Sequence, residues 1–278
     1  MAFSLLTNTT SLGAQSNLAK TSFRLGQNIG RLSSGKRINR SADDAAGLAI
    51  SSKMTAHIRG LAQSKRNAFD AVSMVQTAEG ALSEINGLLT RMRELAVQAS
   101  TGGTMVTTDR SALNLEFQQL ESEINRIVEV TKFNGQVLLN GALSSGVSFQ
   151  VGILNTTNDR ITVSVANSTA STMLNANSAS IGQIADARSA IEQVDSAIQA
   201  VATRRNTLGA TQNRLEVTIS NLGTIHENLS AANSRIVDVD VAAETAEMSQ
   251  NQILMQAGVS VLGQANQMPS MVLSLLGG

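Results

Sequence analysis

The feature that most constrains the fold is a heptad pattern of apolar residues over residues 61–99. Two series of positions, offset by three residues, repeat every seven residues, and only one member, Ser64, is polar. The series are Leu61, Ala68, Val75, Leu82, Leu89, Ala96 and Ser64, Ala71, Ala78, Ile85, Met92, Ala99. Such spacing is typical of a coiled-coil seam, so we predict one helix of about 58 Å, at 1.5 Å per residue, packed against other helices.

Two further segments show helical spacing. Residues 109–131 carry apolar side chains at alternating steps of four and three, and the Gly/Thr-rich residues 100–108 before them indicate a turn. Residues 181–235 carry an apolar residue at every seventh position from Ala187, while the partner series that starts at Ile184 becomes mixed from Arg205 onwards. Short connections make consecutive helices antiparallel neighbours, so we expect a bundle.

Composition favours the same architecture. The chain of 278 residues has no tryptophan or tyrosine, six phenylalanines and a single proline. A core without large aromatic side chains must be built from Leu, Ile, Val, Met and Ala, which suits long helices packed side by side. A length of 278 residues is enough for one or two domains.

The middle of the chain changes to strand spacing. Apolar residues alternate with polar ones over residues 147–151 and again over 161–165, with a turn composition at 155–159 between them. This pattern predicts a β-hairpin. Residues 166–180 are rich in Ser, Asn and Ala, and we expect an exposed link there. The predicted fold class is therefore mainly α, with long antiparallel helices in coiled-coil bundles and a small β-hairpin region.

Both ends of the chain are amphipathic. Residues 18–32, with Ser22 as a polar member, and residues 254–275 carry apolar side chains at steps of four and three. Pro269 is expected to loosen the second helix locally. Polar segments, residues 33–41 and 233–240, join these ends to the rest, and neither end has an aromatic anchor in its seam. An amphipathic helix gains stability by burying its apolar face, so we expect the ends to self-associate. The alternative is an ordinary intramolecular bundle.

Charge is balanced over the whole chain but not along it. There are 21 basic and 21 acidic residues, so no global field favours nucleic acid or an anionic membrane. The first 42 residues contain basic but no acidic side chains, and the residues after 235 contain acidic but no basic side chains. These groups are Lys20, Arg24, Arg31, Lys36, Arg37, Arg40 and Asp238, Asp240, Glu244, Glu247. The ends could pair within one subunit or between neighbours, or form two independently solvated faces.

The residues required for an enzyme site are scarce. The chain has no cysteine, and its two histidines, His57 and His226, are far apart. The adjacent acids Asp43 and Asp44 favour helix capping over metal binding. We expect no catalytic, cofactor or metal site, no nucleic-acid binding and no membrane span. Residues 1–15 lack the charge and apolar run of a cleavable signal peptide, so secretion would need another route.

Several segments resemble the bacterial flagellin family. They are LSSGKRINRSADDAAGLAI at residues 32–50, RELAVQ at 93–98, FNG at 133–135, SRIVDVDVAAE at 234–244, QILMQAG at 252–258, VLGQANQ at 261–267 and VLSLL at 272–276. The resemblance covers most of residues 1–140 and 181–276. Because only residues 166–180 lie where many members carry large variable outer domains, the chain resembles a minimal flagellin.

The resemblance implies a division of the chain between two tubes of a filament. Residues 1–42 and 236–278 would be the two halves of an inner-tube coiled-coil domain. Residues 43–180, with a β-hairpin near 133–165, and the helix of residues 181–235 would form the outer-tube domain. The implied inner-tube assembly residues are Leu5, Leu12, Leu18, Leu25, Ile29, Leu32, Leu254, Val261, Ala265, Met268, Val272 and Leu275.

The resemblance also implies function and partners. The chain would be a structural subunit, exported by the flagellum's own type III apparatus, that polymerises into the extracellular filament for swimming. An export chaperone would hold the C-terminal helix, and filament cap and hook–filament junction proteins would be further partners. Host Toll-like receptor five recognises some members, and Arg91, Leu95 and Glu116 match its contact positions, although Thr90 stands where Gln is common. Filament packing would be the primary role of these residues.

Two alternatives stay open on the sequence. The first is a hook–filament junction protein, which has related ends but does not repeat. The second is a secreted coiled-coil protein that contacts host cells.

Overall fold

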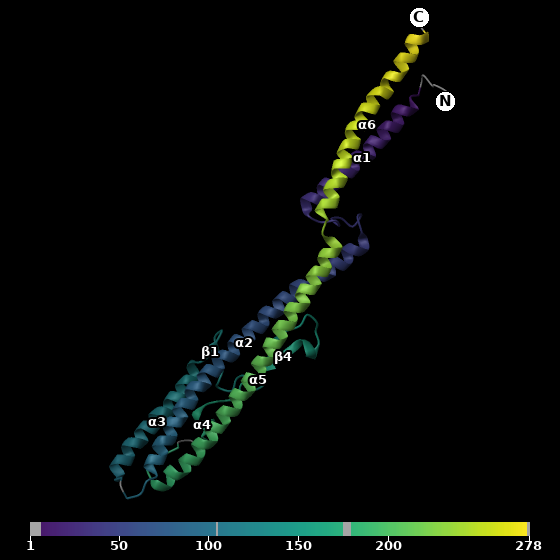
Figure 1. The fold of residues 1–278 in the computed structure, drawn as a ribbon. Helices are drawn as coiled ribbons and strands as arrows, with labels where there is room; N and C mark the ends of the chain where they lie inside the picture. The colour runs from purple at the N-terminus through teal and green to yellow at the C-terminus, as the bar shows by residue number, and fades with distance from the viewer. Residues whose placement is uncertain (1–6, 104, 175–178, 277–278) are drawn as a thin grey trace. The chain divides into compact units, whose positions relative to one another are not determined.

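A computed structural model of the chain describes residues 7–103, 105–174 and 179–276, with side chains described as far as residue 268. Its long helices are α1 (Thr9–Ser34), α2 (Ala45–Ala99), α3 (Thr107–Val130), α5 (Ile184–Val237) and α6 (Val241–Leu276) (Figure 1). The shorter elements are β1 (Lys132–Phe133), β2 (Gln136–Val137), β3 (Val147–Gln150), the 3-10 helix η1 (Thr157–Asp159), β4 (Arg160–Val163) and α4 (Ala170–Met173). The predicted fold class of long helices with a small hairpin region is confirmed.

The chain forms two compact units. Residues up to 56 together with those from 228 onwards form one, which we call the terminal unit, and residues 57–227 form the other, the central unit. The division falls inside the continuous helices α2 and α5, whereas the domain boundaries expected from the sequence follow residues 42 and 235.

The core of the central unit is the predicted heptad seam of α2. All members of both series, from Leu61 to Ala99, are buried. Phe117, Ile124 and Val128 of α3 and the apolar series of α5 from Ala187 to Leu215 belong to the same buried core. The polar member of the seam is also satisfied, because the Ser64 hydroxyl donates a hydrogen bond of 2.9 Å to the Gly152 carbonyl. The seam is thus buried as the spacing predicts.

The predicted hairpin is formed by β3 and β4. The strands are antiparallel, with Val147 opposite Val163 and Phe149 opposite Ile161. A second hairpin, β1–β2, turns at Asn134 and Gly135, whose φ angles are 48° and 80°. An Asn-Gly pair between two short strands favours this turn because both residues must adopt positive φ. The dipeptide was the available sequence signal for this second hairpin.

The expectation that residues 166–180 form an exposed link is wrong. In the described part of this segment, Ser168, Ala170, Met173 and Leu174 are buried against the central core. The Ser168 N–H donates to the Leu139 carbonyl at 2.8 Å, and the Ala170 N–H donates to Asn125 Oδ1 at 3.0 Å. Small side chains with satisfied backbone groups can pack closely on a helix, so a polar composition does not require exposure here.

The terminal unit contains α1 and α6, and local hydrogen bonds fix where these helices begin and end. Asn8 caps α1 by accepting the Ser11 N–H at 3.0 Å, and α1 ends at Gly35, which has a left-handed φ of 69°. Asp240 caps α6 by accepting the Ala242 N–H at 2.9 Å, and α6 continues as a helix past Pro269. Lys36, which follows α1, and Asp238, which precedes α6, form an isolated antiparallel β-bridge.

Of the two adjacent acids of the terminal unit, Asp44 caps α2, whereas Asp43 holds the turn before it. Asp43 Oδ2 accepts the backbone N–H groups of Arg40 at 2.9 Å and Asn39 at 3.1 Å, and Asp44 Oδ1 accepts that of Gly47 at 2.8 Å. Across the described residues there is no group of three His, Cys, Asp or Glu side chains arranged for a metal ion. No helix among them is long and apolar enough to cross a membrane.

Candidate assembly interface of the terminal helices

The helices α1 and α6 lie side by side along their length (Figure 1). Their contact follows a coiled-coil seam, whose buried or half-buried positions recur at alternating steps of three and four residues. The seam positions are Ser11, Ala14, Leu18, Thr21, Leu25, Asn28 and Leu32 on α1, and Glu244, Met248, Asn251, Met255, Gly258, Leu262 and Ala265 on α6.

Contacts along this seam show that the helices are antiparallel. Near the start of α1, the Ser11 hydroxyl donates to Asn266 Oδ1 at 2.7 Å. Further along α1, Leu18 lies over Gly258, where an added Cβ would stand 3.2 Å from Leu18 Cδ1. The early part of α1 is therefore level with the late part of α6.

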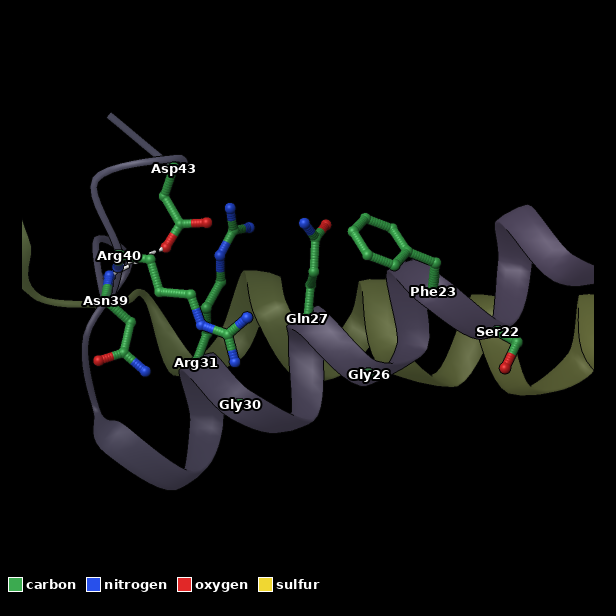
Figure 2. A pocket seen from close by; sticks show the side chains of 9 residues that line it. All are labelled: Ser22, Phe23, Gly26, Gln27, Gly30, Arg31, Asn39, Arg40 and Asp43. Atoms are coloured by element: carbon green, nitrogen blue, oxygen red, sulfur yellow. Dashed lines mark hydrogen bonds between the residues drawn. The ribbon is translucent and has the colours of Figure 1, made fainter. Parts of the chain in front are cut away.

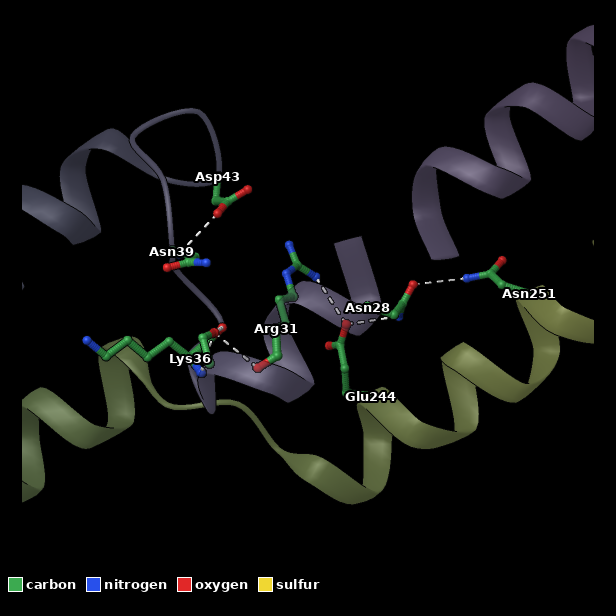
Figure 3. A network of polar contacts seen from close by, with 8 residues as sticks. Asn28, Arg31, Lys36, Asn39, Asp43, Glu244 and Asn251 are labelled. Atoms are coloured by element: carbon green, nitrogen blue, oxygen red, sulfur yellow. Dashed lines mark hydrogen bonds and ion pairs between the residues drawn. The ribbon is translucent and has the colours of Figure 1, made fainter. Parts of the chain in front are cut away.

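A polar cluster occupies the other end of the seam (Figure 3). The Asn28 side-chain amide donates to Glu244 Oε1 at 2.9 Å, and the Asn251 amide donates to Asn28 Oδ1 at 3.2 Å. The Arg31 guanidinium stands 3.7 Å from the same Glu244 oxygen. Asn28, Glu244 and Asn251 are buried, so each buried polar group finds a partner, as low-dielectric burial requires.

Many apolar side chains of this helix pair face away from the seam. Among the described residues these exposed side chains are Leu12, Phe23 and Ile29 on α1, and Val241, Ile253, Leu254, Val259, Val261 and Met268 on α6. Leu254, Val261 and Met268 form one line with a seven-residue spacing, and Leu254 is 48% exposed. Large apolar side chains gathered on one face of a helix usually mark a contact surface.

The twelve inner-tube positions implied by the family resemblance fall into three groups. Leu18, Leu25, Leu32 and Ala265 lie in the seam between α1 and α6. Leu12, Ile29, Leu254, Val261 and Met268 are exposed. Leu5 and the side chains of Val272 and Leu275 lie outside the described residues. Apolar spacing did not reveal the buried polar positions 28, 244 and 251, because it searches only for apolar side chains.

Opposite charge at the two chain ends produces one ion pair within the described terminal unit, Arg31–Glu244. Within the described terminal unit, no carboxylate lies within ion-pair distance of Lys20, Arg24, Lys36 or Arg40. The Arg37 guanidinium instead donates to the Ile236 carbonyl at 2.6 Å. Charge attraction inside one subunit therefore accounts for little of the imbalance, and most of these charges remain at the surface.

A hollow of about 280 Å³ lies beside the last turns of α1 (Figure 2). Phe23, Gln27 and Arg31 of α1 line it together with Asn39, Arg40 and Asp43 from the following segment. Phe23 is 68% exposed. Backbone hydrogen bonds from Arg40 and Asn39, with a smaller contribution from the nearby guanidinium groups, lower the pKa of Asp43. An exposed ring beside two guanidinium groups is typical of protein–protein contacts.

The three positions matched to receptor contacts lie in the central unit and differ in exposure. Arg91 of α2 is exposed and forms two ion pairs of 2.9 Å, one with Glu94 on the same helix and one with Glu116 of α3. Hydrogen bonds to Glu94 and Glu116 raise the pKa of Arg91. Leu95, in contrast, has 0% exposure and belongs to the central core. A packing role is therefore evident for Leu95, and surface contact is available to Arg91 and Glu116.

Family models identify both halves of this architecture. Residues 5–144 match the bacterial flagellin N-terminal helical region, and residues 191–276 match the bacterial flagellin C-terminal helical region. The chain belongs to the bacterial flagellin family. Membership makes it a structural subunit of the flagellar filament, an extracellular polymer of identical subunits, and not an enzyme. The alternative of a hook–filament junction protein is not favoured.

Individual flagellins agree with this assignment. The chain is 51% identical over 247 residues to a flagellin of Halalkalibacterium halodurans, covering 88% of this chain and 89% of that one. It is 40% identical over 298 residues to a flagellin of Bacillus subtilis, covering 97% and 98%. The crystal structure of Bacillus cereus flagellin matches with a TM-score of 0.50 and 30% identity, covering 60% of this chain and 94% of that one.

Proposed function

We propose that the helix pair α1–α6 of the terminal unit forms the inner tube of the filament, and that the central unit, with the adjoining parts of α2 and α5, forms the outer tube. In this proposal the inner-tube domain comprises residues 1–42 and 236–278, and the outer-tube domain comprises residues 43–235. The observation that carries the proposal is the exposed line of Leu254, Val261 and Met268 on α6. A helix pair with so much apolar surface outside its own seam gains stability when copies of the chain cover that surface.

The two groups of described inner-tube positions then have different roles. Leu18, Leu25 and their seam neighbours hold α1 against α6 within one subunit. The exposed positions, such as Leu254 and Val261, contact neighbouring subunits. Burying one such side chain contributes roughly 1.5–3 kcal/mol, and a polymer repeats that contribution at every subunit. Leu5, Val272 and Leu275 keep their proposed place among the assembly positions.

Seeded growth separates the two groups. We expect the exposed-line variant Leu254→Gln/Val261→Gln to remain helical as a soluble subunit but to fail to elongate filament fragments, because polar amides cannot be buried there without partners. The matched control is Gln250→Ala/Gln264→Ala, which alters two exposed polar positions on the same helix. Growth of the exposed-line variant at the rate of the control would refute the assignment of this line to subunit contacts.

The same exposed line would need cover before assembly. We infer that an export chaperone holds α6 at Leu254 and Val261 until the subunit passes through the type III apparatus, and that cap and junction proteins meet the terminal unit at the ends of the filament. Exposed apolar surface on a helix is the chemistry that a helix-in-groove partner recognises. Export can be measured as subunit released into the medium, with Gln250→Ala/Gln264→Ala as the control. The exposed-line variant should be exported less, and unchanged export would count against a chaperone at this line.

Host Toll-like receptor five is a second candidate partner, for the central unit. The exposed Arg91–Glu116 pair favours it, since arginine side chains are enriched at the energetic centres of interfaces. Leu95 would contribute only by supporting the helix that carries Arg91. Soluble subunit carrying Arg91→Ala should activate receptor-expressing cells less than the unchanged chain. If the unchanged chain gives no activation, this partner is excluded.

A further inference from the structure

The apolar part of the α1–α6 seam does not by itself define one register. Its larger side chains form two series with the same seven-residue spacing: Leu18, Leu25 and Leu32 on α1, and Met248, Met255 and Leu262 on α6. If one helix slides along the other by seven residues, apolar side chains again meet apolar side chains. Other groups must therefore set the register.

The polar cluster of Asn28, Arg31, Glu244 and Asn251 can do this. Asn28 lies between Glu244 and Asn251 and is hydrogen-bonded to both, at 2.9 and 3.2 Å. The Glu244 side chain is 9% exposed and also has the Arg31 guanidinium 3.7 Å away. Unlike the apolar series, this arrangement occurs once along the described part of the seam.

A slip of seven residues would break the cluster. In one direction Glu244 would move against Leu25, and in the other it would pass beyond Leu32 and leave Asn28 without the carboxylate. A buried carboxylate that loses its partners carries a large desolvation penalty, whereas slipped apolar contacts cost little. The polar groups thus discriminate between registers that the apolar side chains do not distinguish.

A steric feature agrees with the same register. Leu18 lies over Gly258, where an added Cβ would come within 3.2 Å of Leu18 Cδ1. A slip of one heptad would place Leu18 over Asn251 or Ala265, both of which carry a Cβ. Of these three registers, only the observed one therefore places Leu18 over a residue that lacks a Cβ.

We propose that Asn28, Arg31, Glu244 and Asn251 are positioning residues that hold α1 and α6 in a single register. The register fixes where the exposed apolar line of α6 lies relative to α1. Subunits of a polymer must present the same surface at every repeat, so a mixture of registers would interrupt growth. The proposal concerns the pairing within one chain and does not depend on which tube the terminal unit occupies.

Cysteine pairs can report the register directly, because the chain has no cysteine of its own. Ser11→Cys with Asn266→Cys reports the observed register, since these side chains are 2.7 Å apart. Ser11→Cys with Val259→Cys reports a slip of one heptad. Both pairs are placed in the full chain, oxidised as soluble subunit and as filament, and compared by the fraction cross-linked. The observed-register pair should dominate in the otherwise unchanged chain.

Replacing the cluster by apolar residues should remove the preference. With Asn28→Leu, Glu244→Leu and Asn251→Leu together, we expect the ratio of observed to slipped cross-link to fall at least about tenfold. Glu244→Gln should lower the ratio by less, because its amide oxygen can still accept from Asn28 while the charge that pairs with Arg31 is lost. Far-UV circular dichroism confirms that each variant is helical. An unchanged ratio in the apolar variant would overturn the proposal.

A relocation variant tests the proposal by a gain of the slipped register. Exchanging two α1 seam residues, Thr21→Asn and Asn28→Thr, moves the amide one heptad towards the start of α1. Arg24 stands seven residues before Arg31, so the slipped register would again offer an amide and a guanidinium to Glu244. The Ser11→Cys/Val259→Cys cross-link should then become the major one. Retention of the original register, or absence of the observed-register cross-link in the unchanged chain, would contradict the proposal.

Discussion

The central and terminal units use the same heptad spacing but bury it differently. In the central unit both series of α2 are buried, and large side chains such as Leu82, Ile85 and Leu89 are completely covered within one subunit. In the terminal unit the seam carries small and polar residues, while Leu254 and Val261 remain exposed. A heptad repeat therefore establishes that a helix pairs, but not whether its partner belongs to the same chain. The α2 seam of the central unit is covered within one subunit, and in our proposal the exposed line of the terminal unit is covered by other copies.

The largest expected difference follows from removing α1. Deleting residues 1–30 should abolish polymerisation, because α6 loses the helix that it packs against, while the central unit keeps its own core. Sedimentation after seeding measures polymer, and thermal melting by circular dichroism measures the remaining fold. Filaments formed by the shortened chain would break the distinction between the two units.

Matched leucine truncations should have opposite consequences in the two units. Leu82→Ala should lower the free energy of unfolding of the soluble subunit by about 2–5 kcal/mol, because it leaves a cavity in a closed core. Leu254→Ala should change that free energy by no more than about 0.5 kcal/mol but should slow seeded growth, because its side chain is exposed before assembly. Urea titration and elongation rates provide the two measurements. Equal loss of stability in both variants would place Leu254 in an intramolecular core.

Surface ion pairs of the central unit should contribute far less than its seam. Arg93 and Asp195 join α2 to α5 at 2.6 Å, but both side chains are about half exposed. A double-mutant cycle with Arg93→Ala and Asp195→Ala should give a coupling of about 0.2–1 kcal/mol, reduced by salt. A coupling comparable with the Leu82→Ala effect would mean that charge, rather than apolar packing, joins these helices.

The smallest effect is expected at the Asp43 carboxylate, which holds the turn before α2. Hydrogen bonds from the Arg40 and Asn39 backbones lower the pKa of Asp43 below its ordinary value of 3.8. A lowered pKa in the folded state means that the stabilisation is present above pH 3.8 and is lost as pH falls through the lowered value. An NMR titration of the Asp43 carboxyl should show a midpoint below 3.8, and the acid-induced loss of protection at the Arg40 amide should disappear in Asp43→Asn. A midpoint at or above 3.8 would contradict these hydrogen bonds.

Sequence patterns predicted the helices of the central unit well because its apolar series and its buried series coincide. They also predicted the β3–β4 hairpin, whose strands have one buried face. They failed at residues 166–180, where the described part buries Met173 and Leu174 despite its polar composition, and where backbone N–H groups donate to Asn125 Oδ1 and to the Leu139 carbonyl.

The candidate interface was predicted only in part. The spacing of Leu254, Val261 and Met268 indicated an apolar line on α6, but the side that pairs with α1 also carries Glu244 and Asn251. Polar seam residues have no periodic apolar signal, and their burial depends on partners far away in the sequence. The family resemblance therefore indicated the function, whereas the structure distinguished exposed from paired positions.

A reconstruction of the assembled filament at side-chain resolution would show directly what covers the exposed α6 line. We predict that Leu254, Val261 and Met268, exposed in the single subunit, are buried against neighbouring copies in the inner tube, while Asn28 and Glu244 remain paired within each chain. If the α6 line instead faces solvent in the filament, other copies do not cover the terminal unit at this surface, which would contradict the proposed assembly.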